Sequence, residues 1–128
     1  MAAIGANDES NLDELLAPDF VDHNPMPDQQ PGREGFKQWM RTARSSFPDL
    51  QVSVEDVVAE DDRVAGRVRY RGTHSGPLAG VGGTGRRVEF EAFHVVRFRH
   101  RQITEWWGTA DLLGALMQAG ARVVGPDA

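Results

Sequence analysis

Hydrophobic side chains recur along this chain with two different periods. Between residues 33 and 47 they fall three or four positions apart, with Phe36, Met40 and Phe47 on one helical face. After residue 50 the spacing becomes two, which is the period of a strand that buries one face. The pattern therefore predicts a helical first part followed by a sheet.

The alternating part of the chain divides into four expected strands with short connections. Because consecutive strands joined by hairpin-like turns pair antiparallel, we expect an antiparallel sheet with helices on one face, an α+β fold. The expected strands cover residues 50–58, 64–74, 88–98 and 103–110. Further helices are expected at 10–17, with Ser10 as N-cap, and at 111–120, with Asp111 as N-cap and Gly120 at the end. Residues 20–25 are expected to form a short extended piece that Pro25 stops.

The glycine-rich connection before the third expected strand contains the pattern G-x-G-x-x-G at residues 80–85. In a dinucleotide-binding fold this pattern follows a strand and opens a helix, whose N-terminus holds the pyrophosphate. Here the glycines lead directly into a strand. The sequence therefore predicts no dinucleotide site and a flexible loop between two strands. In an alternative interpretation, the same glycines let the loop lie close over a ligand.

The length of 128 residues fits one domain, so we expect residues 1–128 to form a single unit. Hydrophobic residues make up 40% of the chain, which is enough for a core. The sequence contains no cysteine, which excludes disulfides, thiolate metal sites and a cysteine nucleophile. This usage suits a reducing compartment, and we expect a cytoplasmic protein.

The formal net charge of −5 gives the protein no electrostatic attraction to nucleic acid or to an anionic membrane. No apolar run approaches the roughly 18 residues that span a bilayer. The first ten residues contain no basic residue and no long apolar stretch, so they are not expected to be a signal peptide. We therefore expect neither nucleic acid nor a membrane among the partners.

His94 is the most informative polar residue, because it lies on the apolar face of an expected strand, in phase with Phe90, Ala92 and Val96. A buried imidazole needs a partner. That partner is either a backbone carbonyl or water in a packed core, or a ligand to which His94 donates a hydrogen bond or a proton. Asp111 also has two interpretations that are compatible: it caps the last helix, or it carries protons at the mouth of an apolar pocket that raises its pKa.

Other polar and aromatic residues are candidates for the wall of a ligand cavity. A curved sheet covered by one layer of helices often leaves a space between the layers where a small molecule binds. Each candidate also has a plainer interpretation, which is core packing for the aromatic residues and loop structure for the others. The candidate ligand-binding residues are Asn24, Trp39, Tyr70, His74, Phe90 and Trp106. The four histidines lack the spacing of a metal site, so no metal is expected.

The opposite face of the expected sheet carries charges of both signs. Arginines 67, 69 and 71 share one strand and glutamates 89 and 91 share its expected neighbour, so cross-strand ion pairs are predicted. Three apolar residues, Phe93, Val95 and Trp107, lie on the same face. This face is either a solvated surface with a few exposed aromatics or the contact surface for a second copy of the chain.

Several segments together resemble the SnoaL-like polyketide cyclase family, which belongs to the NTF2-like, or ketosteroid-isomerase-like, superfamily. The resemblance runs from about residue 10 to residue 120. It implies a cone-shaped α+β fold, in which a curved antiparallel sheet wraps around helices, and a homodimer or homotetramer. It implies no metal and no organic cofactor. The segments that carry it are LDELLAPDFVDHNP, PGREGFKQW, FPDLQVSVEDVVAEDDRVAGRV, GTHSG, TGRRVEFEAFHVVRF and ITEWWGTADLLGALMQAG.

In the cyclases of this family an intramolecular aldol reaction closes the last ring of an aromatic polyketide. An acidic group moves the proton, and a histidine, here matched by His94, stabilises the enolate. The family's catalytic aspartate falls on Gly108, and Asp111 matches a second, less essential acidic position. The resemblance therefore implies a cofactor-free enzyme acting on a hydrophobic carbonyl compound through His94 and Asp111, by cyclisation or by a related isomerase, lyase or hydrolase reaction.

Two departures from the family pattern leave other readings open. The glycine at position 108 favours a non-catalytic module that only binds a small molecule or holds copies of the chain together. The family also begins with a full helix that covers the cone, and MAAIGAND resembles only its last turn or two. We therefore expect a shortened N-terminal helix.

Overall fold

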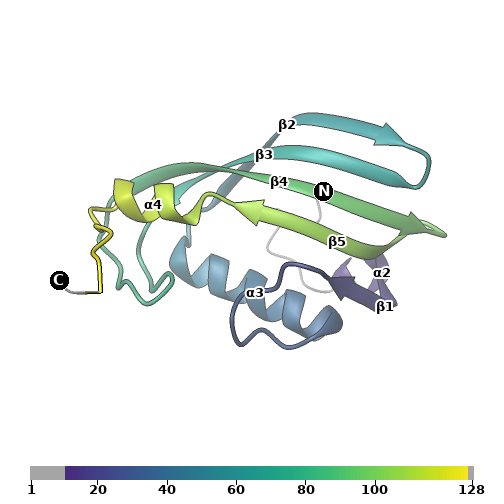
Figure 1. Cartoon of the computed structure of the whole chain (residues 1–128), viewed down its shortest axis with the longest axis horizontal. Helices are drawn as coiled ribbons and strands as arrows, with labels where there is room; N and C mark the ends of the chain where they lie inside the picture. Colours follow the sequence, from purple (N-terminus) through teal and green to yellow (C-terminus); the bar gives the residue numbers. More distant parts are fainter. Residues whose placement is uncertain (1–10, 127–128) are drawn as a thin grey trace.

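The computed structural model describes residues 11–126 and contains one curved five-stranded sheet with helices beside it (Figure 1). The strand order is β1-β5-β4-β3-β2. The helices are α2 (Leu12–Leu15), α3 (Gly32–Ser46) and α4 (Leu112–Gln118), and the strands are β1 (Leu16–Asp22), β2 (Gln51–Glu60), β3 (Arg63–Thr73), β4 (Arg87–Arg99) and β5 (Gln102–Ala110). The expected α+β class is confirmed, and the four strands predicted from the period of two are β2 to β5.

The first strand was not predicted as a member of the sheet. Helix α2 is a single turn, and the chain becomes extended at Leu16, where a longer helix was expected. The expected cap Ser10 and the expected shortened helix lie outside the described residues. β1 pairs with β5 in parallel, with Asp22 opposite Trp106, so one pair of an otherwise antiparallel sheet is parallel. The extended segment therefore begins at Leu16, four residues before the predicted start at residue 20, and it pairs with β5 although no pairing was predicted for it.

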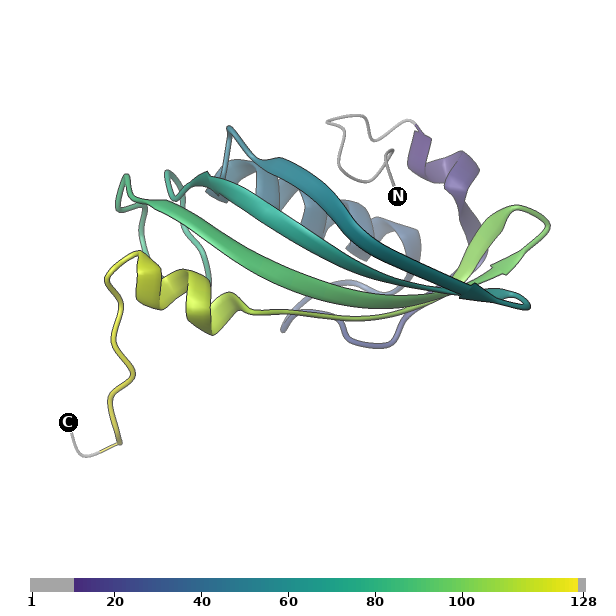
Figure 2. The ribbon, with the colours of Figure 1, turned by 90° about the horizontal axis from the view of Figure 1, so that it is seen from above.

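Helix α3 runs along the concave side of the sheet, as the two views show (Figures 1 and 2). It packs mainly against β1, at one edge of the sheet. Phe36 and Met40 on its buried face join Phe20 and Trp106 in one hydrophobic cluster. A second cluster lies farther along the sheet and joins Phe47, Tyr70, Phe90 and other residues. The space between α3 and the central strands lies between these two clusters.

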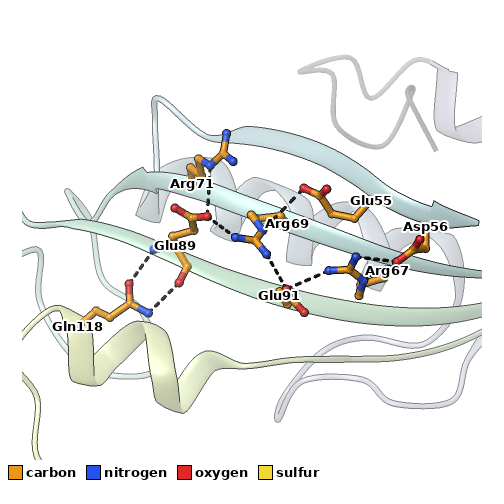
Figure 3. A network of polar contacts seen from close by, with 8 residues as sticks. All are labelled: Glu55, Asp56, Arg67, Arg69, Arg71, Glu89, Glu91 and Gln118. Atoms are coloured by element: carbon orange, nitrogen blue, oxygen red, sulfur yellow. Dashed lines mark hydrogen bonds and ion pairs between the residues drawn. The ribbon is translucent and has the colours of Figure 1, made fainter.

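The convex face carries the predicted ion pairs, with α3 behind the sheet (Figure 3). Arg69 contacts Glu89 at 2.7 Å and Glu91 at 2.8 Å, and Arg67 shares Glu91 at 3.1 Å. The register places Arg69 opposite Glu91 and Arg71 opposite Glu89. Cross-strand pairing of these charges is confirmed, and the carboxyl of Glu89 has its pKa lowered chiefly by its hydrogen bond with Arg69.

Candidate active site

A cavity of about 570 Å³ lies between helix α3 and the concave face of the sheet. Its size falls in the range of sites for small organic molecules. Much of its wall is apolar or aromatic, and polar groups come from the end of β1 and the loop after it, from α3 and from the sheet. The lining residues include five of the expected ones, Asn24, Trp39, Tyr70, Phe90 and Trp106, together with His94.

His94 stands on the concave face of β4 with no side chain beside it on either neighbouring strand. Its partners in register are Gly66 on β3 and Gly108 on β5. The side chain is only 7% exposed, and its ring contacts the indole of Trp106 at 4.5 Å between centroids. Among the described residues, no group hydrogen-bonds its buried Nδ1. Burial lowers the pKa of His94 to about 4, so the imidazole is neutral at pH 7 and carries one N–H donor.

Gly108 allows this packing because a larger residue has no space. A Cβ at this position would lie 2.6 Å from Nε1 of Trp106 and 2.7 Å from Cδ2 of His94. Both distances are shorter than ordinary contacts, so a side chain here would displace one of the two rings. The resemblance places the catalytic aspartate of the family at this position. In this chain the site is therefore built without a carboxylate there.

The loop after β1 brings polar groups to the edge of the cavity. Asn24 accepts a hydrogen bond from the Gly108 backbone N–H at 3.0 Å through Oδ1. Asn24 is exposed and lines the cavity, so its amide nitrogen is a donor that water or a ligand can reach. Asp22 accepts hydrogen bonds from the Asn24 backbone N–H and from Nε2 of Gln29, both at 3.0 Å. Asp22, Asn24 and Gln29 all line the cavity.

Asp111 does not line this cavity. Its side chain caps α4 by accepting a hydrogen bond from the Gly114 backbone N–H at 2.9 Å, as the helix-cap interpretation predicted. Asp111 is exposed and borders a shallow depression that also includes Arg69 and Glu91 of the convex face. The structure therefore does not bring Asp111 and His94 together in one site, because the Asp111 carboxylate is bonded to the first turn of α4.

His74 is also absent from the cavity wall. It is fully buried beside Phe47, and its Nδ1 lies 3.2 Å from the hydroxyl of Thr84. Its backbone carbonyl accepts hydrogen bonds from the N–H groups of Thr84 and Gly85. His74 therefore holds the glycine-rich loop against the end of β3. The turn within this loop places Leu78 in the cavity wall.

Asp22 and Leu78 are cavity residues that the sequence pattern did not identify. The alternation of Phe20 and Asp22 on one side of β1 is the local signal for Asp22, and it is only three positions long. Leu78 lies in a stretch without any period. Its role depends on a tight turn in which Leu78 and Val81 exchange two backbone hydrogen bonds.

A profile of the SnoaL-like polyketide cyclase family matches residues 1–119. The chain belongs to this family. The structure of IdmH from Streptomyces antibioticus, a candidate polyketide cyclase, is 36% identical, with a TM-score of 0.80 over 94% of this chain and 92% of IdmH. TsrD from Streptomyces laurentii is 30% identical, with a TM-score of 0.85 over 94% of this chain and 89% of TsrD. These similarities confirm the expected NTF2-like fold.

Among proteins of assigned activity, the SnoaL-like chain is similar to DauD of Streptomyces sp. strain C5, an aklanonic acid methyl ester cyclase. The two are 29% identical over 111 residues, which is 85% of this chain. The chain spans only 66% of the length of DauD. Within residues 11–126, none of the helices has the length and apolar character to cross a bilayer.

Proposed function

We propose that this SnoaL-like protein closes a ring in a hydrophobic, polyketide-type carbonyl compound by acid–base chemistry, without a bound cofactor. The observation that carries the proposal is His94: a neutral imidazole, more than nine-tenths buried, in the wall of an apolar cavity. Its Nδ1 is enclosed by protein, so the ring nitrogen that we propose for a hydrogen bond with a ligand oxygen is Nε2. The similarity to DauD supports ring closure as the reaction.

In the proposed mechanism, the N–H of His94 donates a hydrogen bond to a ligand carbonyl oxygen. The amide N–H of Asn24, whose orientation is fixed by Gly108, is the second donor. As a proton leaves the carbon next to this carbonyl, negative charge develops on the oxygen. Donors placed in advance around that oxygen stabilise the enolate, because they need not reorient when the charge appears.

We assign the proton transfer to Asp22 in place of the expected Asp111. The Asp22 carboxylate lines the cavity, and two hydrogen bonds hold it in position as an acceptor. It removes the proton from carbon, the enolate carbon forms the new bond to a second carbonyl, and the resulting alkoxide takes the proton back to become a hydroxyl. Isomerisation or epoxide opening would use the same groups.

The first step can be tested without the natural substrate. The probe is 2-tetralone, a bicyclic aromatic ketone whose α-protons exchange in D₂O when a base and a hydrogen-bond donor promote enolisation. We expect the wild-type protein to accelerate this exchange, measured by NMR. His94→Gln and Asp22→Asn should each slow it at least about tenfold, since general acid–base groups contribute roughly 10²- to 10⁴-fold.

Asp111→Asn is the matched control, because asparagine also caps helices and the cap lies outside the cavity. It should exchange 2-tetralone at the wild-type rate. Exchange that is unchanged in His94→Gln would remove the proposed role of His94. Equal rates in the buffer alone and with the wild-type protein would favour the second candidate function.

That second candidate is a binding module without catalysis. Gly108 favours it, because the position that carries the family's acid leaves no space for a carboxylate here. A binding module would quench tryptophan fluorescence when 2-tetralone enters, since Trp39 and Trp106 line the cavity, and would not accelerate exchange.

We further propose that the chain acts as one domain in the cytoplasm and pairs with a second copy through the convex face of the sheet. Phe93 is 53% exposed on that face, next to the ion pairs of Arg67 and Glu91. A face that carries both signs of charge is complementary to itself across a two-fold axis.

A further inference from the structure

A second polar side chain contributes to the cavity wall, away from His94. Tyr70 on β3 is 9% exposed and lines the cavity. Its ring stacks on Phe90 with centroids 5.2 Å apart, which fixes the direction of the phenol. No hydrogen bond reaches its hydroxyl from the described residues, and burial raises the pKa of Tyr70 to about 12. A hydroxyl in this position is a neutral donor that water or a ligand in the cavity can reach.

Strand register fixes how far Tyr70 lies from His94. Tyr70 is opposite Phe90, and His94 is four positions farther along β4. At about 3.3 Å per residue, the two rows of the sheet are roughly 13 Å apart. This distance is longer than a single aromatic ring and suits a polycyclic molecule with an oxygen at each end.

The floor between the two polar groups is low and apolar. Val68 and Ala92 face each other in the row between them, and Ala92 is also opposite Ala110. All three line the cavity. Since alanine side chains project little above the sheet, this row leaves space for a flat ring system to lie along the floor.

Apolar side chains surround the Tyr70 end of the cavity. Tyr70 belongs to the same buried cluster as Phe47, Leu78 and Phe90. Asp22 at the end of β1 is instead opposite Trp106, and Asn24 in the loop after it bonds to Gly108, in the row of His94. The two ends of the cavity therefore differ: one has several polar groups for chemistry, and the other presents the Tyr70 hydroxyl among apolar rings, with Arg44 from the last turn of α3 also lining the cavity.

We propose that the Tyr70 hydroxyl binds an oxygen substituent on the ring farthest from the reacting carbonyl. Tyr70 thereby selects polycyclic ligands that carry a distal hydroxyl or carbonyl group, and it sets which end of the ligand reaches His94. The assignment of the reacting end rests on the proposed function. The recognition of a distal oxygen by Tyr70 is a property of binding and is testable by itself.

The test compares two planar probes, 2-hydroxyanthraquinone and anthraquinone, which differ by one terminal hydroxyl. Binding is followed by quenching of tryptophan fluorescence, because Trp39 and Trp106 line the cavity. We expect the wild-type protein to bind the hydroxylated probe about tenfold more tightly, the effect of one good hydrogen bond in a buried site. Tyr70→Phe, which removes only the hydroxyl and keeps the stacked ring, should abolish this preference and leave the affinity for anthraquinone unchanged.

Asp111→Asn is the control variant, because Asp111 lies outside the cavity wall, and it should retain the preference for the hydroxylated probe. Tyr70→Phe protein that still prefers 2-hydroxyanthraquinone tenfold would overturn the proposal, as would wild-type protein that binds both probes equally. Failure of the proposed function has a different signature. In that case the Tyr70-dependent preference persists while 2-tetralone exchange stays at the buffer rate.

Discussion

At the scale of single residues, His94 combines two properties that depend on its neighbours. The glycines at 66 and 108 leave the imidazole without side chains beside it, and the contact with Trp106 keeps it from water. The first property opens the ring to a ligand, and the second lowers its pKa. A neutral histidine of this kind acts as a hydrogen-bond donor across the whole physiological pH range, with no change of charge.

The lowered pKa predicts a specific dependence of stability on pH. In the unfolded chain His94 titrates near its ordinary pKa of 6.5, and in the folded protein near 4. The unfolded state therefore binds the proton first as pH falls, and stability is lost between pH 6.5 and 4, with no further loss from this group below that range. Between pH 7 and pH 5 the loss is about 2 kcal/mol.

Replacing His94 with glutamine removes this contribution. We expect the free energy of unfolding, measured by urea titration, to decrease from pH 7 to pH 5 in both proteins. The decrease should be about 2 kcal/mol smaller in His94→Gln than in the wild type. The two proteins differ at no other ionisable group, so the difference isolates His94. An identical pH dependence would mean that His94 is more hydrated than its 7% exposure indicates.

At the scale of elements, the sequence predicted those parts of the fold whose signal is local. The period of two identified β2 to β5, and the spacing of Phe36, Met40 and Phe47 identified α3. β1 was missed because its partner is β5, more than 80 positions away, and a parallel pair has no turn between its strands. The candidate site was incomplete for the same reason: Asp22 enters the cavity only through that pairing.

For Asp111 the local sequence signal was clear, but it allowed two interpretations: a helix cap and a proton carrier in the cavity. The sequence placed it correctly at the start of the last helix, where its carboxylate accepts the Gly114 N–H. Its distance from the cavity wall depends on how the chain turns from β5 into α4. The residue pattern of the sequence does not predict the direction of that turn.

The cap predicts how substitutions at Asp111 affect stability. Asp111→Ala should lower the free energy of unfolding by about 1 kcal/mol, because the N–H groups of the first turn of α4 lose their acceptor. Asp111→Asn should unfold like the wild type in the same urea titration, since asparagine caps equally well. A loss in Asp111→Asn as large as in Asp111→Ala would show that the negative charge, rather than the cap, is what stabilises α4.

At the scale of the whole molecule, the two faces of one sheet are suited to different partners. The concave face has mostly small or apolar side chains and two polar ones, His94 and Tyr70, in the cavity wall, which suits a ligand. The convex face has paired charges around Arg69, with exposed Phe93 and Val95 beside them. Exposed aromatic residues are enriched at the centre of protein contact surfaces, and charged groups are typical of the rim around it.

The proposed pairing of two copies through the convex face gives the last prediction. Wild-type protein at micromolar concentration should sediment as a dimer, or as a tetramer if a second contact exists. Phe93→Arg should shift it toward the monomer, because it places an unpaired charge at the centre of the contact. Val123→Arg is the control, since this residue is similarly exposed but lies in the segment after α4, away from the strands.

Because the ion pairs of Arg69 also face the partner, high salt should weaken the wild-type assembly. A wild-type monomer at this concentration would leave the convex face as a solvated surface, and ligand binding on the concave face would be unaffected.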